Sequence, residues 1–546
     1  MPISQNHADI PEESAVSKLS DADHSVSPPR LAFPVEYNAA FDLLERNLRA
    51  GRGGKVAYID DAGSTTYAQL NERVNRFANA LVSLGLRMED RVLLCLHDGV
   101  DFPVAFLGCI KAGIIPIAVN TVLTKSEYEY MLRDSRARAL IVSAPLWPLF
   151  RDLRATSASL EKVIVSGAHS DGELRFVDLL AQSTVEFACA PTRADDACFW
   201  LYSSGSTGSP KGTVHAHSSL IQTAELYARP VLGIREDDVL FSAAKLFFAY
   251  GLGNALTFPL AVGATTVLMA ERPTPASVAE RLVTHQATVF FAVPTLFAAM
   301  LASAELPERE QVRLRVCTSA GEPLPKEIGK RFAEHFQIDV LDGIGSTELL
   351  HIYLSNRPGE VRYGTTGRPV PGYQIRLVDD SGAAAPNGEI GELQVNGPTS
   401  AMYYWNNREK SRATFVGAWT RSGDKYRIDD EGYYVYCGRS DDMLKVSGIY
   451  VSPVEVESAL ITHPAVLEAA VIGSPDSDQL IKPRAYVVLK PGVAADTQLS
   501  AALKRHVKES LAPYKYPRWI EFVSELPKTA TGKIQRFRLR EMDQRT

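Results

Sequence analysis

The chain has 546 residues, which exceeds the size that one hydrophobic core supports, so we expect roughly two to four domains. Its hydrophobic fraction of 45% and its charged fraction of 22% are typical of globular proteins. The net charge of −6 excludes the basic surface that binds nucleic acids or anionic membranes, and we expect neither partner.

The six cysteines are scattered along the sequence, and no two of them form a Cys-x-x-Cys pair. A long chain with few, scattered thiols is typical of a reducing compartment. The first 30 residues are polar and lack the apolar run of a signal peptide. We therefore expect a cytoplasmic protein.

Residues 1–32 are rich in Ser, Asp and Pro, which predicts a disordered tail. A first strand is expected at residues 55–59. Thr66 and Gln69 then have the spacing of a capping box, in front of a helix whose apolar residues recur on one face. The structured part of the chain should thus begin near residue 33.

Strand and helix patterns alternate further along the chain. Apolar runs at residues 91–96, 114–119 and 139–143 predict strands, and residues 102–112 predict a helix between the first two. The alternation returns at residues 289–301. This order is typical of an α/β fold in which helices cover parallel sheets.

Residues 246–269 form a long and mostly apolar stretch, for which a membrane span is one interpretation. Gly251, Pro259 and Gly263 interrupt this stretch. A buried helix-turn-strand unit is therefore the favoured interpretation.

The sequence changes character after about residue 361. Short apolar segments alternate with Gly, Pro and Asn turns over residues 361–438, which predicts a small β-barrel-like subdomain. Residues 441–546 then combine helix and strand patterns, which predicts a separate, small α+β domain. Residues 33–440 form the large N-terminal domain in this interpretation.

A run of small residues at 202–212 carries the strongest chemical signal. Its glycines and hydroxyl residues let several backbone N–H groups converge on one anion, and Lys211 adds a positive charge. It is not a Walker A loop, because Pro210 precedes Lys211 and Gly212 follows it. A flexible Ser/Gly loop is the alternative, but the apolar run before it favours phosphate binding. The candidate phosphate-binding residues are Ser203, Ser204, Gly205, Ser206, Thr207, Gly208 and Lys211.

This segment resembles the phosphate loop of the acyl-adenylate-forming superfamily, which includes acyl-CoA synthetases and the adenylation domains of peptide synthetases. Further segments that resemble this family's motifs follow in the same order, over about residues 33–538. The resemblance implies that residues 33–440 are an adenylation domain and that residues 441–546 are a mobile C-terminal domain. It also implies ATP, Mg²⁺ and coenzyme A as cofactors and cosubstrates.

Two segments resemble the family's adenine and phosphate site. One is the turn at residues 319–323, and the other is the stretch at residues 342–348. The resemblance implies that Thr347 contacts phosphate and that Glu348 holds Mg²⁺. The family's usual aromatic residue is absent, since Gly343 directly follows Asp342. The implied nucleotide-binding residues are Ser319, Ala320, Gly321, Glu322, Pro323, Asp342, Gly343, Ile344 and Thr347.

Three residues near the domain boundary have implied roles. Asp424, preceded by Ser422 where the family has Thr, resembles the acid that accepts the ribose hydroxyls. Arg439 would contact the ribose or the phosphates, and Asp441 would be the hinge between the two domains. A solvated, charged turn is the alternative for Arg439 and Asp441, and likewise for Lys445 and Gly448 further on.

The C-terminal domain contains two lysines with implied catalytic roles. Lys533 lies in a segment that resembles the family's last motif and would hold the carboxylate and the α-phosphate in line during adenylation. Lys445 and Gly448 would enter the site for the thioester step, after the domain rotates about Asp441.

Residues 245–254 occupy the place of the family's acyl pocket and resemble the benzoate-CoA ligases. Tyr250 and Ile352 are too bulky for a long acyl tunnel, and the stretch lacks an acid to pair with an α-amino group. His351 is either a packed core histidine or a substrate contact. The candidate residues for the aryl pocket are Phe248, Ala249, Tyr250, Ala320, Gly345, His351 and Ile352.

The favoured function is ligation of benzoate, or a simple substituted benzoate, to coenzyme A. A second possibility changes the acid to hydroxybenzoate or 2-aminobenzoate, or the acceptor to a carrier protein. A non-catalytic nucleotide-binding protein is disfavoured because Lys533, Glu348 and Asp424 are all present, and a P-loop kinase because Pro210 precedes Lys211. The expected partners are small molecules, with the chain as a monomer or homodimer.

Overall fold

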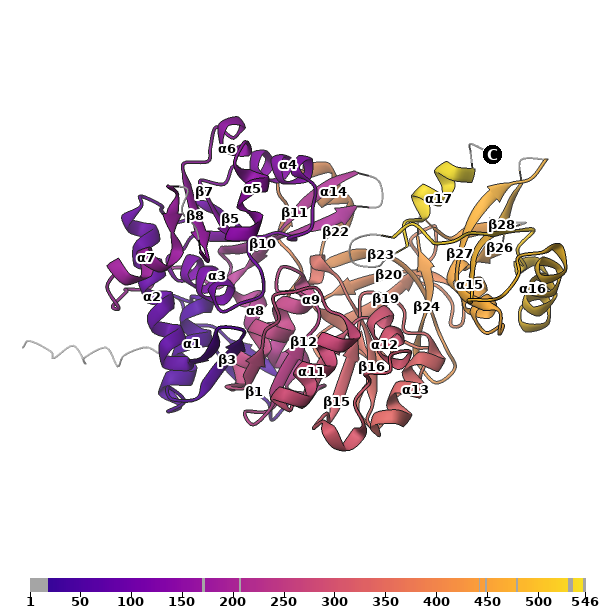
Figure 1. Cartoon of the computed structure of the whole chain (residues 1–546), viewed down its shortest axis with the longest axis horizontal. Coiled ribbons are helices and arrows are strands. Elements are labelled where there is room, and N and C mark those ends of the chain that lie inside the picture. The colour runs from indigo at the N-terminus through magenta and orange to yellow at the C-terminus, as the bar shows by residue number, and fades with distance from the viewer. Residues whose placement is uncertain are drawn as a thin grey trace, which may run out of the picture.

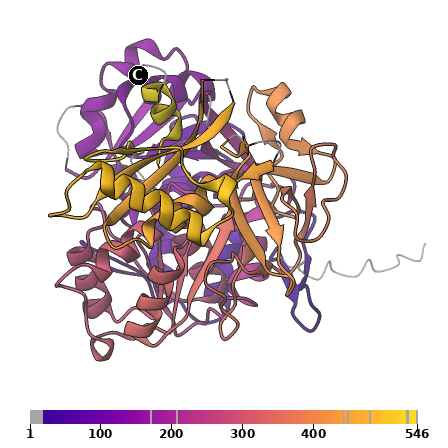
Figure 2. The ribbon, with the colours of Figure 1, turned by 90° about the vertical axis from the view of Figure 1, so that its right-hand side faces the viewer.

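The computed structural model describes residues 18–168, 172–205, 208–440, 442–446, 449–477, 480–528 and 534–543. Two large sheets with their helices and a smaller β-rich sheet make up the larger part of the molecule, and the C-terminal elements lie to one side of it (Figure 1). Figure 2 shows these C-terminal elements, coloured gold and yellow, in front of the larger part.

The first large sheet has eight strands in the order β21-β11-β10-β6-β5-β7-β8-β9. The strands from β10 to β9 run parallel, and β11 and β21 extend one edge in antiparallel fashion. The strands are β5 (Arg91–Cys95), β6 (Ile115–Ala118), β7 (Ala139–Ser143), β8 (Lys162–Ser166), β9 (Leu174–Arg175), β10 (Ala197–Gly205), β11 (Gly208–Ala216) and β21 (Tyr403–Tyr404). The helices between them are α3 (Asp101–Lys111), α4 (Lys125–Ser135), α5 (Trp147–Phe150), α6 (Leu153–Thr156) and α7 (Phe176–Gln182), with the 3₁₀ helix η1 (Ala144–Leu146).

Helix α2 (Tyr67–Ser83) follows from its local sequence. The Thr66 hydroxyl accepts a hydrogen bond from the Gln69 N–H at 3.3 Å, and the Gln69 side chain accepts one from the Thr66 N–H at 2.9 Å. The predicted capping box is thus confirmed. The apolar face of the helix is buried through Leu70, Val74, Phe77, Ala78 and Leu81.

The second large sheet has nine strands in the order β18-β17-β16-β15-β14-β12-β13-β3-β4. The strands from β3 to β16 run parallel, and the edge strands β4, β17 and β18 are antiparallel. The strands are β3 (Val56–Asp60), β4 (Gly63–Thr66), β12 (Val239–Ser242), β13 (Thr265–Val267), β14 (Val289–Ala292), β15 (Val316–Ser319), β16 (Val340–Gly345), β17 (Ile352–Ser355) and β18 (Arg368–Pro369).

The helices of this part include α1 (Ala39–Arg49), α8 (His217–Thr223), α10 (Phe258–Val262), α11 (Pro275–His285), α12 (Pro294–Leu301), α13 (Lys326–Phe336) and the 3₁₀ helices η4 (Arg309–Gln311) and η5 (Thr347–Leu349). A single core joins the two sheets. Leu94 and Leu201 of the first sheet and Phe291 and Leu341 of the second belong to one cluster of fully buried side chains. The predicted α/β fold of helix-covered sheets is confirmed.

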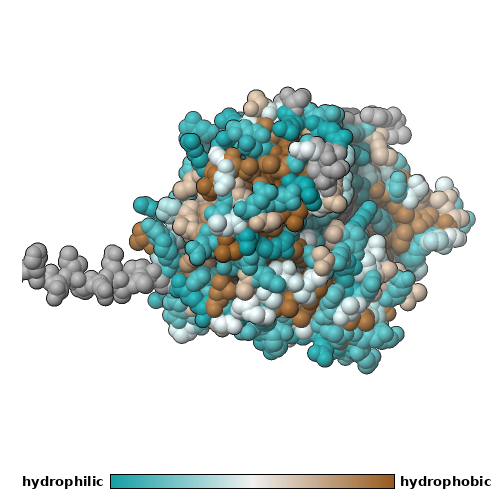
Figure 3. Space-filling view, turned by 60° about the vertical axis from the view of Figure 1, so that its left-hand side comes forward, coloured by the Kyte–Doolittle hydropathy of each residue, from teal (hydrophilic) through white to brown (hydrophobic). Residues whose placement is uncertain are grey.

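The apolar stretch at residues 246–269 is broken into short elements and buried. It contains α9 (Ala249–Leu252), the π-helix η3 (Gly253–Thr257), α10 and β13, and the turn at Gly263 has a φ of 85°. No helix in the described part of the chain is long and apolar enough to cross a membrane. On the face drawn in Figure 3, apolar residues form small patches between hydrophilic ones.

The β-rich sheet comprises β19 (Gln374–Val378), β20 (Gly391–Asn396), β22 (Phe415–Val416), β23 (Trp419–Ile428) and β24 (Tyr434–Arg439), with α14 (Arg408–Thr414) beside it. The C-terminal part contains β25 (Leu444–Val446), β26 (Ile449–Val451), α15 (Pro453–Ile461), β27 (Val466–Pro475), β28 (Ile481–Leu489), α16 (Thr497–Ser510), η6 (Pro513–Lys515), β29 (Trp519–Phe522) and α17 (Arg536–Asp543). The predicted small α+β C-terminal domain is therefore present.

The N-terminal tail predicted for residues 1–32 is wrong for its second half. The strands β1 (Asp21–Asp23) and β2 (Arg30–Ala32) pair as a hairpin. The Ser20 hydroxyl donates to the buried Asp42 carboxylate at 2.6 Å, and His24 lies 2.7 Å from the buried Glu225. Buried carboxylates of the larger part of the molecule therefore hold this segment in place. Its polar composition alone is typical of a disordered tail. Residues 1–17 lie outside the described part of the chain.

Candidate active site

The carboxyl ends of the parallel strands in the second sheet bring most of the predicted residues together. Ser319 ends β15, and Asp342 lies beside it on β16 in the sheet register. Ala292, at the end of β14, pairs with Ser319 on its other side. Ligands of α/β sheets bind beyond the carboxyl ends of the strands, so the predicted adenine segment is at the expected edge.

The predicted phosphate loop includes the end of β10 and the start of β11, which pair as antiparallel strands. The structure places Ser203 and Lys211 opposite each other in this hairpin. Ser203 is buried, and its hydroxyl accepts from that of Thr213 at 3.4 Å. Ser206 and Thr207 lie outside the described residues, as do the side chain of Ser204 and the surroundings of Gly205 and Gly208.

Lys211 belongs to a cluster with Tyr404 and Glu348. The Lys211 ammonium lies over the Tyr404 ring, 4.7 Å from its centroid, and the Tyr404 hydroxyl donates to Glu348 Oε1 at 2.8 Å. Burial lowers the pKa of Lys211, and the negative charge of Glu348 opposes this shift. Burial, together with Glu348, raises the pKa of Tyr404, so this hydroxyl stays protonated as a donor.

Glu348 and Thr347 are also fixed through their main chain. The imidazole Nε2 of His215, on β11, lies 2.8 Å from the Thr347 carbonyl oxygen, and the Ala401 N–H donates to the Glu348 carbonyl at 2.8 Å. His215 is completely buried, and burial lowers its pKa to about 4. The neutral imidazole therefore donates from Nε2 and joins the phosphate hairpin to the Thr-Glu segment.

The turn at residues 319–323 combines a left-handed glycine with small side chains. Gly321 has a φ of 92°, which favours glycine, and Ala320 is small and buried. Thr295 donates to the carboxylate of Glu322 at 3.0 Å. Asp342 is buried, its Oδ1 has no hydrogen-bond partner among the described residues, and burial raises its pKa well above the usual range. One oxygen of this buried carboxyl group is therefore left as a position where a polar ligand can form a hydrogen bond.

Asp424 and Arg439 face each other across the strands β23 and β24. The guanidinium of Arg439 donates to Asp424 Oδ1 at 3.1 Å and to the Ser422 carbonyl at 3.2 Å. Gly423 has a φ of 76°, and a Cβ at this position would come within 2.8 Å of Arg439. The buried Asp424 and the half-exposed Arg439 thus form a preorganised polar pair.

The predicted aryl-pocket residues come from three neighbouring segments. Phe248, Ala249 and Tyr250 lie at the start of α9, behind the end of β12. The Tyr250 hydroxyl and the Thr318 hydroxyl, on β15, are 2.5 Å apart. Ile352 is opposite Gly345 in the register, and a Cβ on Gly345 would come within 2.5 Å of the His351 carbonyl oxygen. Glycine is therefore required at this close approach.

His351 has the packed, hydrogen-bonded environment that was one of its two predicted roles. Its Nε2 lies 3.2 Å from the Tyr250 carbonyl oxygen and 3.2 Å from Asn254 Oδ1. Its ring packs edge-on against Phe258, with 4.6 Å between the centroids. Burial lowers the pKa of His351 to about 3, so that the ring is neutral and donates from Nε2.

Comparisons with known proteins agree with this geometry. The sequence matches the AMP-binding enzyme family over residues 44–405 and the AMP-binding enzyme C-terminal domain over residues 455–533. The chain belongs to the AMP-binding enzyme family. The resemblance to acyl-adenylate-forming enzymes is thereby confirmed.

Two relatives and one solved structure resemble this member of the AMP-binding enzyme family over nearly its full length. It is 65% identical to the benzoate–CoA ligase of Thauera aromatica, across 96% of this chain and 99% of the relative. It is 50% identical to the 4-hydroxybenzoate–CoA/benzoate–CoA ligase of Rhodopseudomonas palustris, across 93% of this chain and 94% of the relative. A crystal structure of a benzoate CoA ligase from Burkholderia xenovorans superposes with a TM-score of 0.86 at 57% identity, covering 92% of this chain and 100% of that one.

The donor set around Glu348 fits the Mg²⁺ ion that AMP-binding enzymes are expected to use. Mg²⁺ usually binds one or two carboxylates together with substrate phosphates and water. Glu348 is a half-buried carboxylate that is held by Tyr404 and lies near the ammonium of Lys211. Within the described ranges, no group of three His, Cys, Asp or Glu side chains forms an all-protein metal cage. The site thus suits a metal that arrives with the nucleotide.

The predicted hinge and catalytic residues are mostly outside the described part of the chain. This holds for Asp441, Gly448 and Lys533, and for the side chain of Lys445, whose backbone belongs to β25. Their flanks are described. Asp442 accepts from Arg540 at 2.9 Å, and Lys528 and Ile534 form a β-bridge that brings the two ends of residues 529–533 together.

Sequence reasoning missed four residues that support the site, namely His215, Tyr404, Asn254 and Thr318. Thr318 directly precedes the predicted adenine turn, and Asn254 ends the predicted pocket segment, so their positions carried a weak signal. The sequence contains no indication of a role for His215 or Tyr404.

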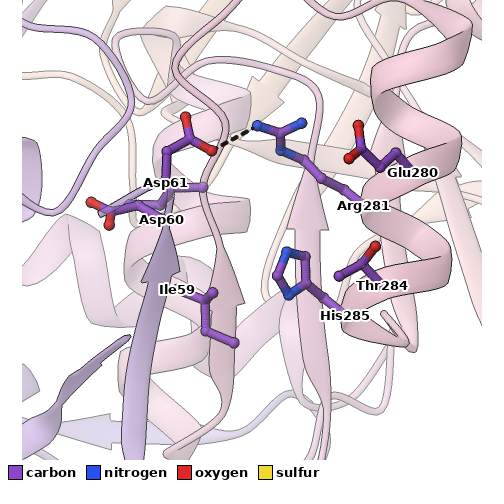
Figure 4. A pocket seen from close by; sticks show the side chains of 8 residues that line it. Ile59, Asp60, Asp61, Glu280, Arg281, Thr284 and His285 are labelled. Carbon is purple, nitrogen blue, oxygen red and sulfur yellow. Dashed lines mark hydrogen bonds and ion pairs between the residues drawn. The ribbon is translucent and has the colours of Figure 1, made fainter. Parts of the chain in front are cut away.

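A cavity of about 120 Å³ lies between β3 and α11 (Figure 4). Its lining includes Asp61, which follows β3, and Arg281 of α11, which are joined by an ion pair of 2.9 Å. A shallower groove of about 470 Å³ lies between the N-terminal hairpin and the β-rich sheet. None of the predicted site residues lines either of them.

Proposed function

We propose that this protein ligates benzoate to coenzyme A in an ATP-dependent reaction that passes through benzoyl-adenylate and releases AMP and pyrophosphate. The observation that carries the proposal is the 65% identity to a benzoate–CoA ligase over nearly the full length of both chains. The site geometry supports it, since the adenine turn and the candidate aryl-pocket residues lie at the carboxyl edge of the second sheet, and His215 joins the phosphate hairpin of the first sheet to Thr347.

In the first step, a carboxylate oxygen of benzoate attacks the α-phosphorus of ATP. A P–O bond to the acyl group forms, and the bond from the α-phosphorus to the bridging oxygen breaks, so that pyrophosphate leaves. Two anions approach each other, and positive charge must be in place where they meet. Lys211 provides such charge at the phosphates, and Lys533 would hold the carboxylate and the α-phosphate in line.

Glu348 would hold Mg²⁺, which supplies positive charge to the triphosphate when it is bound there. Tyr404 and the Ala401 N–H orient this glutamate before the nucleotide arrives. Asp424 would accept the ribose hydroxyls, with Arg439 fixing its carboxylate. The turn at residues 319–323 and Asp342 would accommodate the adenine.

In the second step, the thiolate of coenzyme A attacks the acyl carbon of benzoyl-adenylate. A C–S bond forms, the C–O bond to AMP breaks, and the thiol proton is released to solvent. Lys445 and Gly448 would enter the site for this step after the C-terminal domain rotates about Asp441. One arrangement of the two domains therefore serves adenylation, and the other serves thioester formation.

The aryl pocket favours a flat, uncharged ring. Phe248, Ala249 and Ile352 provide apolar walls, and His351 is neutral because its pKa is about 3. Such a pocket has no buried charge to pair with an α-ammonium group, which disfavours amino acids. The close backbone contact at Gly345 restricts its depth, which disfavours long acyl chains.

The test is AMP release with ATP, Mg²⁺ and coenzyme A across a panel of acids, namely benzoate, hydroxybenzoates, 2-aminobenzoate, halobenzoates, cinnamate, hexanoate and phenylalanine. We expect the highest kcat/KM with benzoate. If hexanoate or phenylalanine is preferred, the pocket assignment is wrong. If none of the acids releases AMP with coenzyme A, a carrier protein becomes the expected acceptor in place of coenzyme A.

4-Hydroxybenzoate is the second candidate substrate. The Tyr250–Thr318 hydroxyl pair places a polar group at the otherwise apolar pocket, and one relative is a 4-hydroxybenzoate–CoA/benzoate–CoA ligase. A site that hydrogen-bonds a substrate hydroxyl discriminates strongly against the analogue without it. The ratio of kcat/KM for the two acids separates these candidates.

All six cysteines are free thiols, which supports a reducing compartment such as the cytoplasm as the place of action. The protein would act on its three small-molecule substrates as a monomer or homodimer.

A further inference from the structure

A buried carboxylate from the first sheet touches the segment that forms the aryl pocket in the second sheet. Asp98 follows the carboxyl end of β5 and is only 3% exposed. Its two oxygens accept from one backbone donor, the Leu246 N–H, at 3.3 and 3.2 Å. Leu246 lies between β12 and α9, four residues before Tyr250. This contact links the two sheets at the start of the pocket segment.

Lys245, the residue before Leu246, places its charge near this carboxylate. Its ammonium donates to the carbonyl oxygens of Met269 and Glu271, so the lysine is held in place at the edge of the sheet. Burial lowers the pKa of Lys245, and the negative charge of Asp98 opposes this shift. A half-buried cation near a buried carboxylate stabilises the charged form of each.

The main chain that Asp98 holds leads directly to the pocket. The Phe248 N–H donates to the Lys245 carbonyl at 3.0 Å, and the Leu252 N–H donates to the Phe248 carbonyl at 2.8 Å. A Cβ on Gly251 would lie 2.0 Å from the Lys245 carbonyl oxygen, so these turns pack without free space. A displacement at Leu246 is therefore transmitted to the residues that follow it.

We propose that Asp98 is a positioning residue for the aryl pocket, which in its ionised form fixes the main chain at Leu246 and thereby places Phe248, Ala249 and Tyr250 against the substrate ring. This inference rests on the proposed function of that pocket. Asp98 does not touch the substrate. It acts through the segment that does.

Affinity for the acid should depend on pH through the ionisation of Asp98. Burial raises the pKa of Asp98 to about 6, and the charge of Lys245 and the Leu246 N–H oppose a larger shift. The carboxylate is therefore charged above about pH 6 and loses its charge as the pH falls through this value. Affinity for the acid should be full at pH 8 and should weaken towards pH 5.5.

The other charged groups around this pair come from the ends of β5 and β3, from α11 and from the segment before α11. His97 precedes Asp98, and burial together with Lys245 lowers its pKa. Asp60, at the end of β3, accepts from the Val100 N–H at 2.8 Å. Glu271 and Arg281, which form an ion pair of 2.8 Å, act on Lys245. All of them remain in a variant changed only at residue 98, so such a variant isolates the contribution of Asp98.

The experiment measures KM from pH 5.5 to 8 with the acid that has the highest kcat/KM in the panel, so that a failure of benzoate as substrate leaves the test intact. In the wild type, KM for the acid should rise on acidification with a midpoint near the pKa of Asp98, while KM for ATP stays constant. Asp98→Asn should raise KM for the acid about tenfold at pH 8, the size expected for losing a hydrogen bond to a charged acceptor, and should abolish the pH dependence.

Lys245→Met is the second variant. Removing the ammonium takes away the charge that keeps Asp98 ionised, so the midpoint of the KM profile should move to higher pH. A residue with a merely structural role would not move this midpoint.

Asp238→Asn is the matched control. Asp238 is also a buried aspartate, but it lies before the amino end of β12 and pairs with Arg315 at 2.6 Å. This variant should lower the Tm without changing KM for the acid or its pH profile. An Asp98→Asn variant with the wild-type KM and pH profile, or a Lys245→Met variant with an unmoved midpoint, would overturn the proposal.

Discussion

Tyr404 holds Glu348 from a strand that is 56 residues further along the chain. Its hydroxyl donates to the carboxylate, and its ring lies under the Lys211 ammonium. One side chain therefore contacts both the implied metal ligand and the lysine that is proposed to bind phosphate. A site whose charges are in place before the substrate arrives loses less free energy to reorganisation.

Tyr404→Phe removes only the hydroxyl and should lower kcat/KM for MgATP about tenfold, the size of one hydrogen bond to a charged group. Steady-state kinetics at several Mg²⁺ concentrations measure this effect, which should be largest at low Mg²⁺. Tyr403→Phe is the control, because Tyr403 is the adjacent residue of β21 and is exposed. Equal kinetics for the two variants would contradict the role of Tyr404.

The sequence predicted Lys211, Glu348 and Asp424 because each lies in a contiguous motif, where neighbouring residues restrict the possible chemistry. Tyr404 and His215 could not be predicted in this way. Their partners, Glu348 and the Thr347 carbonyl, come next to them only when the two sheets pack together. A lone tyrosine or histidine in a sequence does not indicate such a contact.

At the scale of elements, the parallel strands were the most predictable part. Strands β5, β6 and β7 are buried on both faces, so each appears in the sequence as an uninterrupted apolar run. The hairpin of β1 and β2 has no such signal, since its strands are short and polar. Ion pairs and hydrogen bonds to the buried Asp42 and Glu225 hold it instead.

Deleting residues 1–32 should therefore lower the free energy of unfolding by about 1–3 kcal/mol, because it removes hydrogen-bond partners from two buried carboxylates. Urea unfolding followed by circular dichroism measures the change. A deletion of residues 1–17 alone is the control and keeps the hairpin. The account of the hairpin fails if both truncated chains are as stable as the full chain.

At the scale of the whole molecule, the proposed mechanism assigns different residues of the C-terminal domain to the two half-reactions. Lys533→Ala should reduce adenylation about 10²–10³-fold, because it removes positive charge where two anions meet. Thioester formation from supplied benzoyl-adenylate should remain close to the wild-type rate. Pyrophosphate release and benzoyl-CoA formation measured separately give the two rates. An equal loss of rate in both half-reactions would contradict a role of Lys533 that is specific to adenylation.

Lys445→Ala is the reciprocal variant and should slow thioester formation more than adenylation. The opposite outcomes of the two lysine variants would distinguish an alternation of the two domains from a single arrangement that serves both steps. A Lys445→Ala variant with unchanged turnover in the presence of coenzyme A would contradict its place in the site.

The central claim is that benzoate is activated as an adenylate before it reaches coenzyme A. The most direct measurement is the mass of the AMP formed from benzoate that is labelled with ¹⁸O in its carboxylate. Attack of a carboxylate oxygen on the α-phosphorus, followed by cleavage of the acyl C–O bond, predicts one ¹⁸O atom in each AMP. Unlabelled AMP, or label in inorganic phosphate together with ADP, would contradict the account.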